Sequence, residues 1–115
     1  MEIKIRNYSS IYIVDLTGEI DLYNYFKLKE VILKMIDKGI KNYIINFENV
    51  TYLDSSGIGA IIFINTKLKS LGHNLFLVNI NGSVKRVIEL TNLIGFLPIK
   101  ETIQEAIDLF EKNKE

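Results

Sequence analysis

Tyr52–Ala60 reads Tyr-Leu-Asp-Ser-Ser-Gly-Ile-Gly-Ala and stands where a strand pattern gives way to a helix pattern. An apolar run, Tyr43–Phe47, leads towards it, and a long helical periodicity leads away from it. Asp54 is well placed to cap that helix, because its carboxylate can accept a hydrogen bond from a free backbone N–H of the first turn. Ser55 and Ser56 would then lie at the positive end of the helix dipole, where a phosphoryl group meets a favourable field. The pattern indicates a switch site, with an ordinary helix cap as the plainer interpretation.

The length and composition favour one soluble domain spanning residues 1–115, and the order of strands and helices described below predicts an α/β fold class. Fourteen basic residues balance fourteen acidic ones, which gives no electrostatic reason to expect nucleic acid or an acidic membrane as partner. The chain has no cysteine, so disulfides and thiolate chemistry are excluded. It lacks the basic-then-apolar start of a secretory signal, and no apolar run approaches membrane-spanning length. A cytoplasmic location is therefore the default expectation.

The first part of the chain predicts a hairpin followed by a helix. Ile3–Ile5 and Ile11–Leu16 have strand patterns separated by a polar turn. Thr17–Asp21 is expected to leave the second strand as a loop. Apolar residues then recur at helical spacing across Tyr25–Ile36, and Gly39 is well placed to end this helix because glycine adopts the left-handed cap at little cost.

The middle of the chain predicts a central strand and an amphipathic helix. Tyr43–Phe47 is continuously apolar, which suits a strand buried on both faces. The helix after Asp54 is expected to pack on the sheet through one stripe of residues. That stripe comprises Ala60, Ile61, Ile64, Leu68 and Leu71. Ile58 and Ile62 lie outside the stripe on the flank beside the serines, either as boundary residues or as a small exposed docking patch.

The last part predicts two further strands and two further helices. Leu75–Ile80 has a strand pattern, Ser83 can cap a third helix, and Phe96–Ile99 is expected to form an edge strand because its proline donates no ladder bond. Thr102–Glu105 has the form of a capping box at the start of a fourth helix, and Glu111–Glu115 is expected to fray. The predicted fold is a mixed, mostly parallel sheet with an N-terminal hairpin, about five strands and four helices.

Hydrolase chemistry finds little support in the sequence. Ser55 and Ser56 occupy a strand-to-helix turn, but the Gly-x-Ser-x-Gly elbow of a serine nucleophile is absent. The single histidine, His73, lies at the other end of the helix that the serines begin. A helix of about 16 residues is roughly 24 Å long, so this imidazole is far outside hydrogen-bond reach. We therefore predict no enzymatic activity, and His73 is expected to be a solvated loop residue.

Metal and nucleotide sites are weakly indicated. One histidine and no cysteine make zinc improbable, and four carboxylates could converge at one end of the sheet to hold a divalent cation. These are Asp15, Glu19, Asp21 and Asp54. Separate caps and loop carboxylates are the plainer interpretation. Gly57-Ile58-Gly59 lacks the third glycine of a dinucleotide fingerprint and the lysine of a phosphate loop, so we expect no metal and no cofactor.

Three motifs in order resemble the STAS-domain anti-sigma-factor antagonists. Asn46–Gly59 is similar to the family signature, Leu16–Asp21 to its first loop and Ser83–Leu93 to its third helix. The resemblance covers nearly the whole chain and implies a STAS-like fold. The family usually has glycine where this chain has Asn92, and asparagine also tolerates a left-handed cap.

The resemblance implies a partner-switching function. The unphosphorylated protein would bind an anti-sigma factor that is itself a serine kinase, and would thereby release the sigma factor. Phosphorylation of Ser56 by that kinase would separate the two, and a phosphoserine phosphatase would reverse the step. ATP and magnesium would belong to the kinase. The residues implied in partner binding are Asp21, Asp54, Ser55, Gly57, Ile58 and Ile62.

One alternative remains open within the same fold. A free-standing STAS scaffold could serve another signalling or lipid-transport complex and bind through the same surface without phosphorylation.

Overall fold

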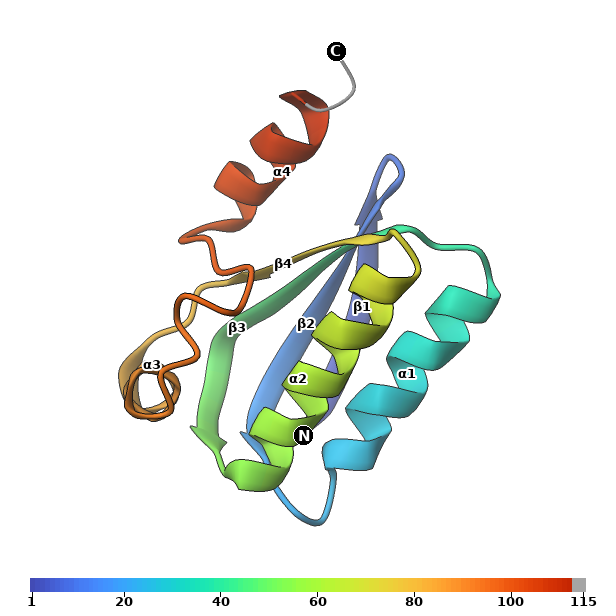
Figure 1. The fold of residues 1–115 in the computed structure, drawn as a ribbon. Helices are drawn as coiled ribbons and strands as arrows, with labels where there is room; N and C mark the ends of the chain where they lie inside the picture. Colours follow the sequence, from blue (N-terminus) through green and yellow to red (C-terminus); the bar gives the residue numbers. More distant parts are fainter. Residues whose placement is uncertain (113–115) are drawn as a thin grey trace.

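A four-stranded mixed sheet forms the centre of the computed structural model, which describes residues 1–112. The strands are β1 (Glu2–Tyr8), β2 (Ile11–Ile20), β3 (Asn42–Leu53) and β4 (Asn74–Val78), in the spatial order β1-β2-β3-β4. β1 pairs with β2 in an antiparallel hairpin, whereas β2, β3 and β4 run parallel. The predicted hairpin and mostly parallel sheet are confirmed (Figure 1).

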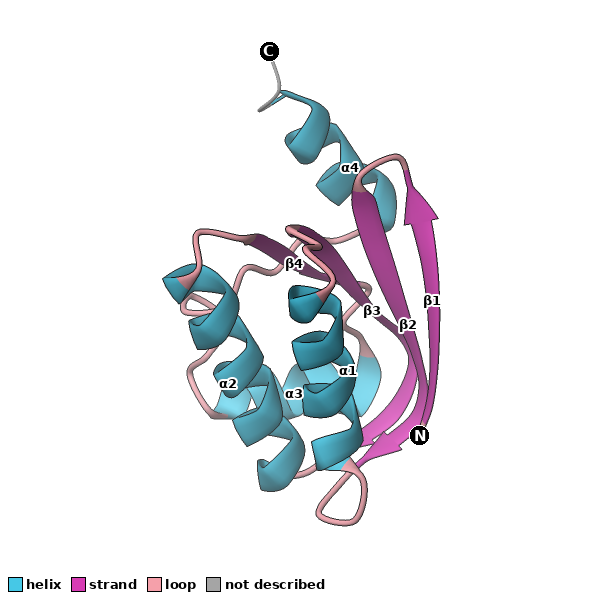
Figure 2. Cartoon of the chain, turned by 90° about the vertical axis from the view of Figure 1, so that its right-hand side faces the viewer, coloured by secondary structure: helices cyan, strands magenta, loops and turns pink. Residues whose placement is uncertain are grey.

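Helices cover both faces of this sheet. They are α1 (Tyr25–Asp37), α2 (Ser55–Ser70), α3 (Gly82–Leu90) and α4 (Ile103–Lys112). α1 and α2 lie side by side against one face, and α4 lies towards one end of the other face (Figures 1 and 2). None of the helices described in residues 1–112 has the length and apolar character to cross a bilayer.

Two apolar clusters hold the layers together. The larger lies between the sheet and α1 and α2, and it includes fully buried Leu28, Phe47 and Leu68. The smaller joins the opposite sheet face to α4, where Phe110 packs edge-on against Phe76 with ring centroids 5.1 Å apart. β3 is buried on both faces because it contributes to both clusters, as its continuous apolar character predicts.

β2 and β3 extend further at their C-terminal ends than predicted, to Ile20 and Leu53. Thr17–Ile20 is not a loop: it continues β2 and pairs with β3 up to the Ile20–Leu53 pair. Two register shifts interrupt this pairing, and Gly18 has a φ of 99° beside one of them. Such bulges let a strand with loop-like residues stay in a sheet, because they absorb an extra residue without ending the ladder.

The predicted fifth strand is reduced to one bridge. Ile99 pairs with Leu77 of β4, and the flanking backbone bonds run from the Leu77 N–H to the Pro98 carbonyl and from the Lys100 N–H to the Leu77 carbonyl. The segment therefore lies at the sheet edge, as predicted. It is too short for a strand because a proline cannot donate a ladder bond.

Two smaller expectations, on the cap of α3 and on Leu71, are wrong. The residue capping α3 is Asn81, not Ser83, whose hydroxyl instead donates to the Thr51 carbonyl at 3.0 Å. Leu71 follows the end of α2 and is exposed, so it does not belong to the core stripe.

The capping box at α4 is present in a modified form. The backbone N–H of Glu105 donates to the Thr102 hydroxyl, and the Glu105 carboxylate accepts from the backbone N–H of Glu101. Of the residues expected to fray, Glu111 and Lys112 belong to α4, and residues 113–115 lie outside the described part of the chain.

Candidate functional site

Asp54 joins the start of α2 to the loop before α1. One carboxylate oxygen accepts hydrogen bonds from the backbone N–H groups of Ser56 at 2.9 Å and Gly57 at 3.1 Å. The other oxygen accepts from the backbone N–H of Leu22 at 3.1 Å. The predicted N-cap is confirmed, and the same side chain also ties together two segments that are 32 residues apart.

Asp21 is fixed on the neighbouring loop. Its carboxylate accepts a hydrogen bond from the backbone N–H of Tyr23 at 2.9 Å, which closes a local turn. Asn24 braces the same loop, because its side chain accepts from the Asp21 N–H and donates to the Glu19 carbonyl. The structure thus brings the loop that carries Asp21 against the Asp54 carboxylate through Leu22.

Gly57 lets the first turn of α2 approach the strand ends closely. A Cβ at this position would lie 2.9 Å from the carbonyl oxygen and from Cγ2 of Ile20, and closer still to a methyl group of Leu53. Real Cβ atoms do not come this near, so any side chain would push α2 away from β2 and β3. The glycine therefore sets the depth at which the preceding serines sit, and it is buried rather than a surface contact.

Both serine hydroxyls are unengaged. Ser55 is exposed and Ser56 half-buried, and within residues 1–112 neither side chain forms a hydrogen bond. Both stand in the first turn of α2, where the free N–H groups and the helix dipole favour negative charge. The arrangement can accept a phosphoryl group on a hydroxyl without first breaking an internal contact. Exposure alone does not choose between the two serines.

The flank of α2 beside the serines is only partly covered. Ile58 is half-buried and packs against the larger core, whereas Ile62 is half-buried and joins neither core cluster. Ile58 is therefore a boundary residue, and Ile62 is the one of the pair whose side chain is available at the surface.

Sequence reasoning missed a set of exposed apolar residues on α2, on α1 and on the loop before α1. We call it the flanking patch, and it consists of Leu22, Tyr23, Phe26 and Phe63, which are 60%, 84%, 44% and 37% exposed. The ammonium group of Lys29 lies 4.2 Å from the ring centroid of Phe63 and so links α1 to α2 across the patch. The available signal was Leu22-Tyr23, a pair of large apolar residues in a predicted loop.

The described residues do not form the candidate metal site, and His73 lies far from the serines. Among residues 1–112, no three histidine or acidic side chains gather into a metal site. Asp15 is instead held by the guanidinium of Arg6 at 2.7 Å and by the side-chain amide of Asn46 at 2.8 Å. His73 follows the far end of α2 and is half-buried rather than fully solvated.

The chain belongs to the STAS domain family, whose model matches residues 2–106. An anti-sigma-B factor antagonist of Staphylococcus aureus (strain NCTC 8325 / PS 47) is 32% identical over 104 residues, which cover 88% of this chain and 94% of that protein. The corresponding protein of Staphylococcus epidermidis is 27% identical over 101 residues.

Solved structures agree with this assignment. The crystal structure of a putative anti-sigma factor antagonist from Thermotoga maritima superposes with a TM-score of 0.86 at 27% identity, and covers 92% of each chain. The anti-sigma factor antagonist SpoIIAA in its unphosphorylated form has a TM-score of 0.73 at 24% identity, and 96% of this chain and 98% of that one are covered. At that identity the second likeness shows the fold alone.

Proposed function

We propose that this protein is a cytoplasmic anti-sigma-factor antagonist whose Ser56 is the site of reversible phosphorylation. In its unmodified form it binds an anti-sigma factor that is also a serine kinase, and this frees a sigma factor. A phosphatase restores the binding form. Family membership and the name of the S. aureus relative support the class of function. The observation that carries the site is the pair of unengaged serine hydroxyls in the first turn of α2, held in place by Asp54.

The choice of Ser56 over Ser55 rests on the motif. Ser56 is the serine that aligns with the family's phosphoacceptor, whereas Ser55 is the more exposed of the two. The backbone N–H of Ser56 donates to Asp54, so its Cα is fixed relative to the loop that carries Asp21. A kinase therefore meets this serine at a fixed backbone position, with its hydroxyl unengaged.

The docking surface extends from the serines along α2 and onto the loop before α1. Its proposed members are Asp21, Asp54, Ser55, Gly57, Ile58 and Ile62, together with the flanking patch. Gly57 acts by setting the depth of the helix start, and the exposed apolar side chains supply area that a partner can bury.

Incubation with the cognate kinase and ATP, followed by intact mass measurement, tests this proposal. The wild-type protein and Ser55→Ala should each gain one phosphoryl group, and Ser56→Ala should gain none. Ser56→Ala should also remain a permanent binder of the anti-sigma factor. Because both serines are unengaged, neither variant removes an internal hydrogen bond, and the two substitutions are matched controls for each other.

The alternative is a STAS scaffold that binds a partner without phosphorylation. Absence of modification in the wild-type protein, combined with stable binding to some other complex, would favour the scaffold. Modification mapped to Ser55 would preserve the function and overturn the residue assignment.

A further inference from the structure

Asn65 is a buried polar residue without a partner. Two asparagines are 6% exposed, Asn46 and Asn65. The side chain of Asn46 donates to Asp15 and accepts hydrogen bonds from the Glu48 backbone and from Asn79. In residues 1–112 no hydrogen bond is made by the side chain of Asn65. No fully buried side-chain nitrogen or oxygen atom in residues 1–112 lacks a partner, so the unpaired amide of Asn65 retains access to the space that it faces.

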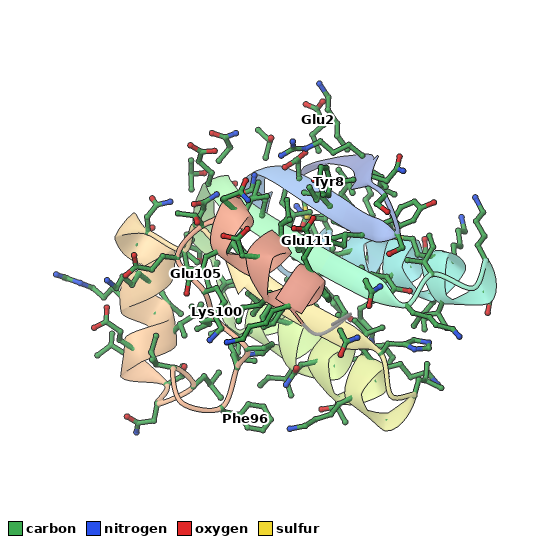
Figure 3. The ribbon with its side chains drawn as sticks, turned by 90° about the horizontal axis from the view of Figure 1, so that it is seen from above. Glu2, Tyr8, Phe96, Lys100, Glu105 and Glu111 are labelled. Atoms are coloured by element: carbon green, nitrogen blue, oxygen red, sulfur yellow. The ribbon has the colours of Figure 1, made fainter. Side chains whose placement is uncertain are left out.

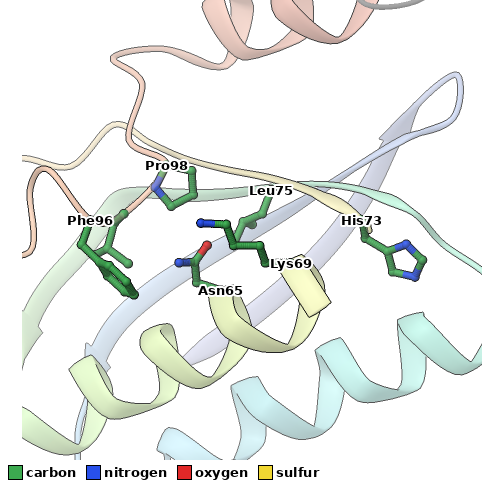
Figure 4. Close-up of a pocket in the computed structure, with 7 residues that line it drawn as sticks. Asn65, Lys69, His73, Leu75, Phe96 and Pro98 are labelled. Carbon is green, nitrogen blue, oxygen red and sulfur yellow. The ribbon is translucent and has the colours of Figure 1, made fainter. Parts of the chain in front are cut away.

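The amide of Asn65 points into a cavity. The cavity has a volume of about 170 Å³ and lies between the second half of α2, the start of β4 and the loop before α4. Figure 4 shows Asn65 directed away from the α2 backbone into this space, with Phe96 and Pro98 on the loop side and Leu75 behind. The volume is close to that of an engineered protein cavity of about 150 Å³ that binds benzene, so one ring fits.

Besides Asn65, the lining combines the Lys69 ammonium group and the imidazole of His73 with apolar walls. Lys69 lies one turn after Asn65 on α2, and it forms no ion pair with any described residue. No acidic residue among those described lines the cavity. Leu97 and Pro98 supply apolar surface, and the ring of Phe96 is 51% exposed without an aromatic partner in residues 1–112. Figure 3 shows Phe96 at the surface, well away from α4.

We propose that this cavity binds a small aromatic carboxylate whose single ring carries a hydrogen-bonding atom. The Lys69 ammonium pairs with the carboxylate, the Asn65 amide bonds the polar ring atom, and Phe96 and Pro98 pack against the ring. Three features of the lining then have a role: the unpaired Asn65 amide gains a partner, the Lys69 ammonium is neutralised and the exposed Phe96 ring is covered.

This site is separate from the proposed phosphorylation site. Asn65 lies nine residues after Ser56 on the same helix, which corresponds to roughly 13 Å of helical rise. The inference therefore does not depend on the partner-switching function, and its test does not involve a kinase.

Amide NMR titration of the whole protein with nicotinate tests the proposal. Nicotinate has a carboxylate and a ring nitrogen that can accept from the Asn65 amide. We expect saturable shifts at Asn65, Leu75 and Leu97, with a dissociation constant of about 5 mM or lower, as the size of a one-ring ligand permits. Benzoate lacks the ring nitrogen and nicotinamide lacks the charge, so both should bind more weakly than nicotinate.

Substitutions of Lys69 and Asn65 test the contact that each residue makes with nicotinate. Lys69→Gln should weaken nicotinate binding by about tenfold, and Asn65→Ala by about threefold to tenfold, in line with a charged and a neutral hydrogen bond. Lys67→Gln is the matched control, because Lys67 is an exposed lysine of the same helix that does not line the cavity. The Lys67→Gln protein should bind nicotinate as tightly as the wild-type protein does.

Three results would overturn the inference. The first is the absence of saturable shifts, which would mean that water alone fills the cavity. The second is equal binding of nicotinate, benzoate and nicotinamide. This comparison uses the wild-type protein, so it needs no control for misfolding. The third is an equal loss in Lys67→Gln and Lys69→Gln, which would indicate a general charge effect.

Discussion

Gly57 sets how closely α2 approaches the ends of β2 and β3. Its missing side chain leaves space that Leu53 and Ile20 fill, and its N–H is capped by Asp54. The sequence identified this residue as part of a motif but gave it a contact role. The structural role could not be deduced, because it depends on strand ends that the sequence pattern placed several residues too early.

Replacement of Gly57 by alanine should destabilise the protein by about 1–3 kcal/mol, because the added methyl group overlaps Leu53 and the Ile20 carbonyl. Gly59→Ala is the matched control. No atom lies within 4 Å of a Cβ at Gly59, and alanine is the better helix former, so this variant should gain about 0.5–1 kcal/mol. Urea unfolding measures both values. Equal effects of the two substitutions would contradict the close approach.

Asp54 shows what a local signal can predict. The pattern of an acidic residue followed by a long apolar periodicity predicts an N-cap, and the cap is present. Its second bond, from the Leu22 backbone, spans 32 residues and has no local signature. Sequence reasoning therefore finds the cap and misses the connection that makes the two loops one surface.

The elements differ from prediction mainly where tertiary pairing overrides local preference. Thr17–Ile20 has turn-like residues, yet its pairing with β3 keeps it in the sheet. Phe96–Ile99 has strand-like residues, yet Pro98 limits it to one bridge. The helices were predicted more accurately than the strands, because each helix carries a repeated apolar stripe, which is a stronger signal than the pattern of a short strand.

The flank of α2 supplies a prediction at the scale of this helix. Ile62→Asp should weaken binding to the anti-sigma factor by more than tenfold while the protein stays folded, because Ile62 is half-buried and lies outside both cores. Thr66→Asp adds the same charge one turn further along α2 at an exposed position and should bind normally.

Calorimetric titration measures the affinity of both variants, and circular dichroism checks their folding. An unfolded Ile62→Asp would place Ile62 in the core. A folded variant with normal affinity would remove this flank from the docking surface.

Acid stability of the whole molecule should depend on Asp15. Partial burial raises the pKa of this carboxyl, but hydrogen bonds from Arg6 and Asn46 outweigh the burial, so its pKa lies below the ordinary value of about 3.9. Its contribution to stability is therefore complete above about pH 4 and is lost as the pH falls through the folded-state pKa.

Urea unfolding between about pH 6 and pH 2 measures this contribution as the difference between the wild-type protein and Asp15→Asn. The difference should be constant above about pH 4 and shrink below it. Asp37→Asn is the control, because Asp37 is exposed and forms no ion pair in the described chain. A stability difference between the wild-type protein and Asp15→Asn that grows as the pH falls would contradict a lowered pKa for Asp15.

Phosphorylation should change the interactions of the molecule and leave its fold intact. A phosphoserine adds a charge of about −1.5 to −2, which a helix start favours by about 0.3–1 kcal/mol. The neighbouring carboxylates of Asp21 and Asp54 offset part of that gain. Since about 1 kcal/mol shifts the melting temperature of a domain of this size by roughly 4–8 °C, the free protein should melt within a few degrees of the unmodified form.

At the proposed docking surface we expect the added charge to have a large effect. A phosphate charge that faces an acidic group of the partner about 6 Å away, at an effective dielectric constant near 20, is repelled by roughly 3 kcal/mol. This repulsion corresponds to a loss of about a hundredfold in affinity.

The most direct test is calorimetric binding of the anti-sigma factor to the Ser56-phosphorylated and the unmodified protein, with thermal melts of the same two samples. The account predicts a dissociation constant about a hundredfold higher after phosphorylation, with a melting temperature changed by only a few degrees. An unchanged dissociation constant, or a fall in melting temperature of more than roughly 10 °C, would contradict it.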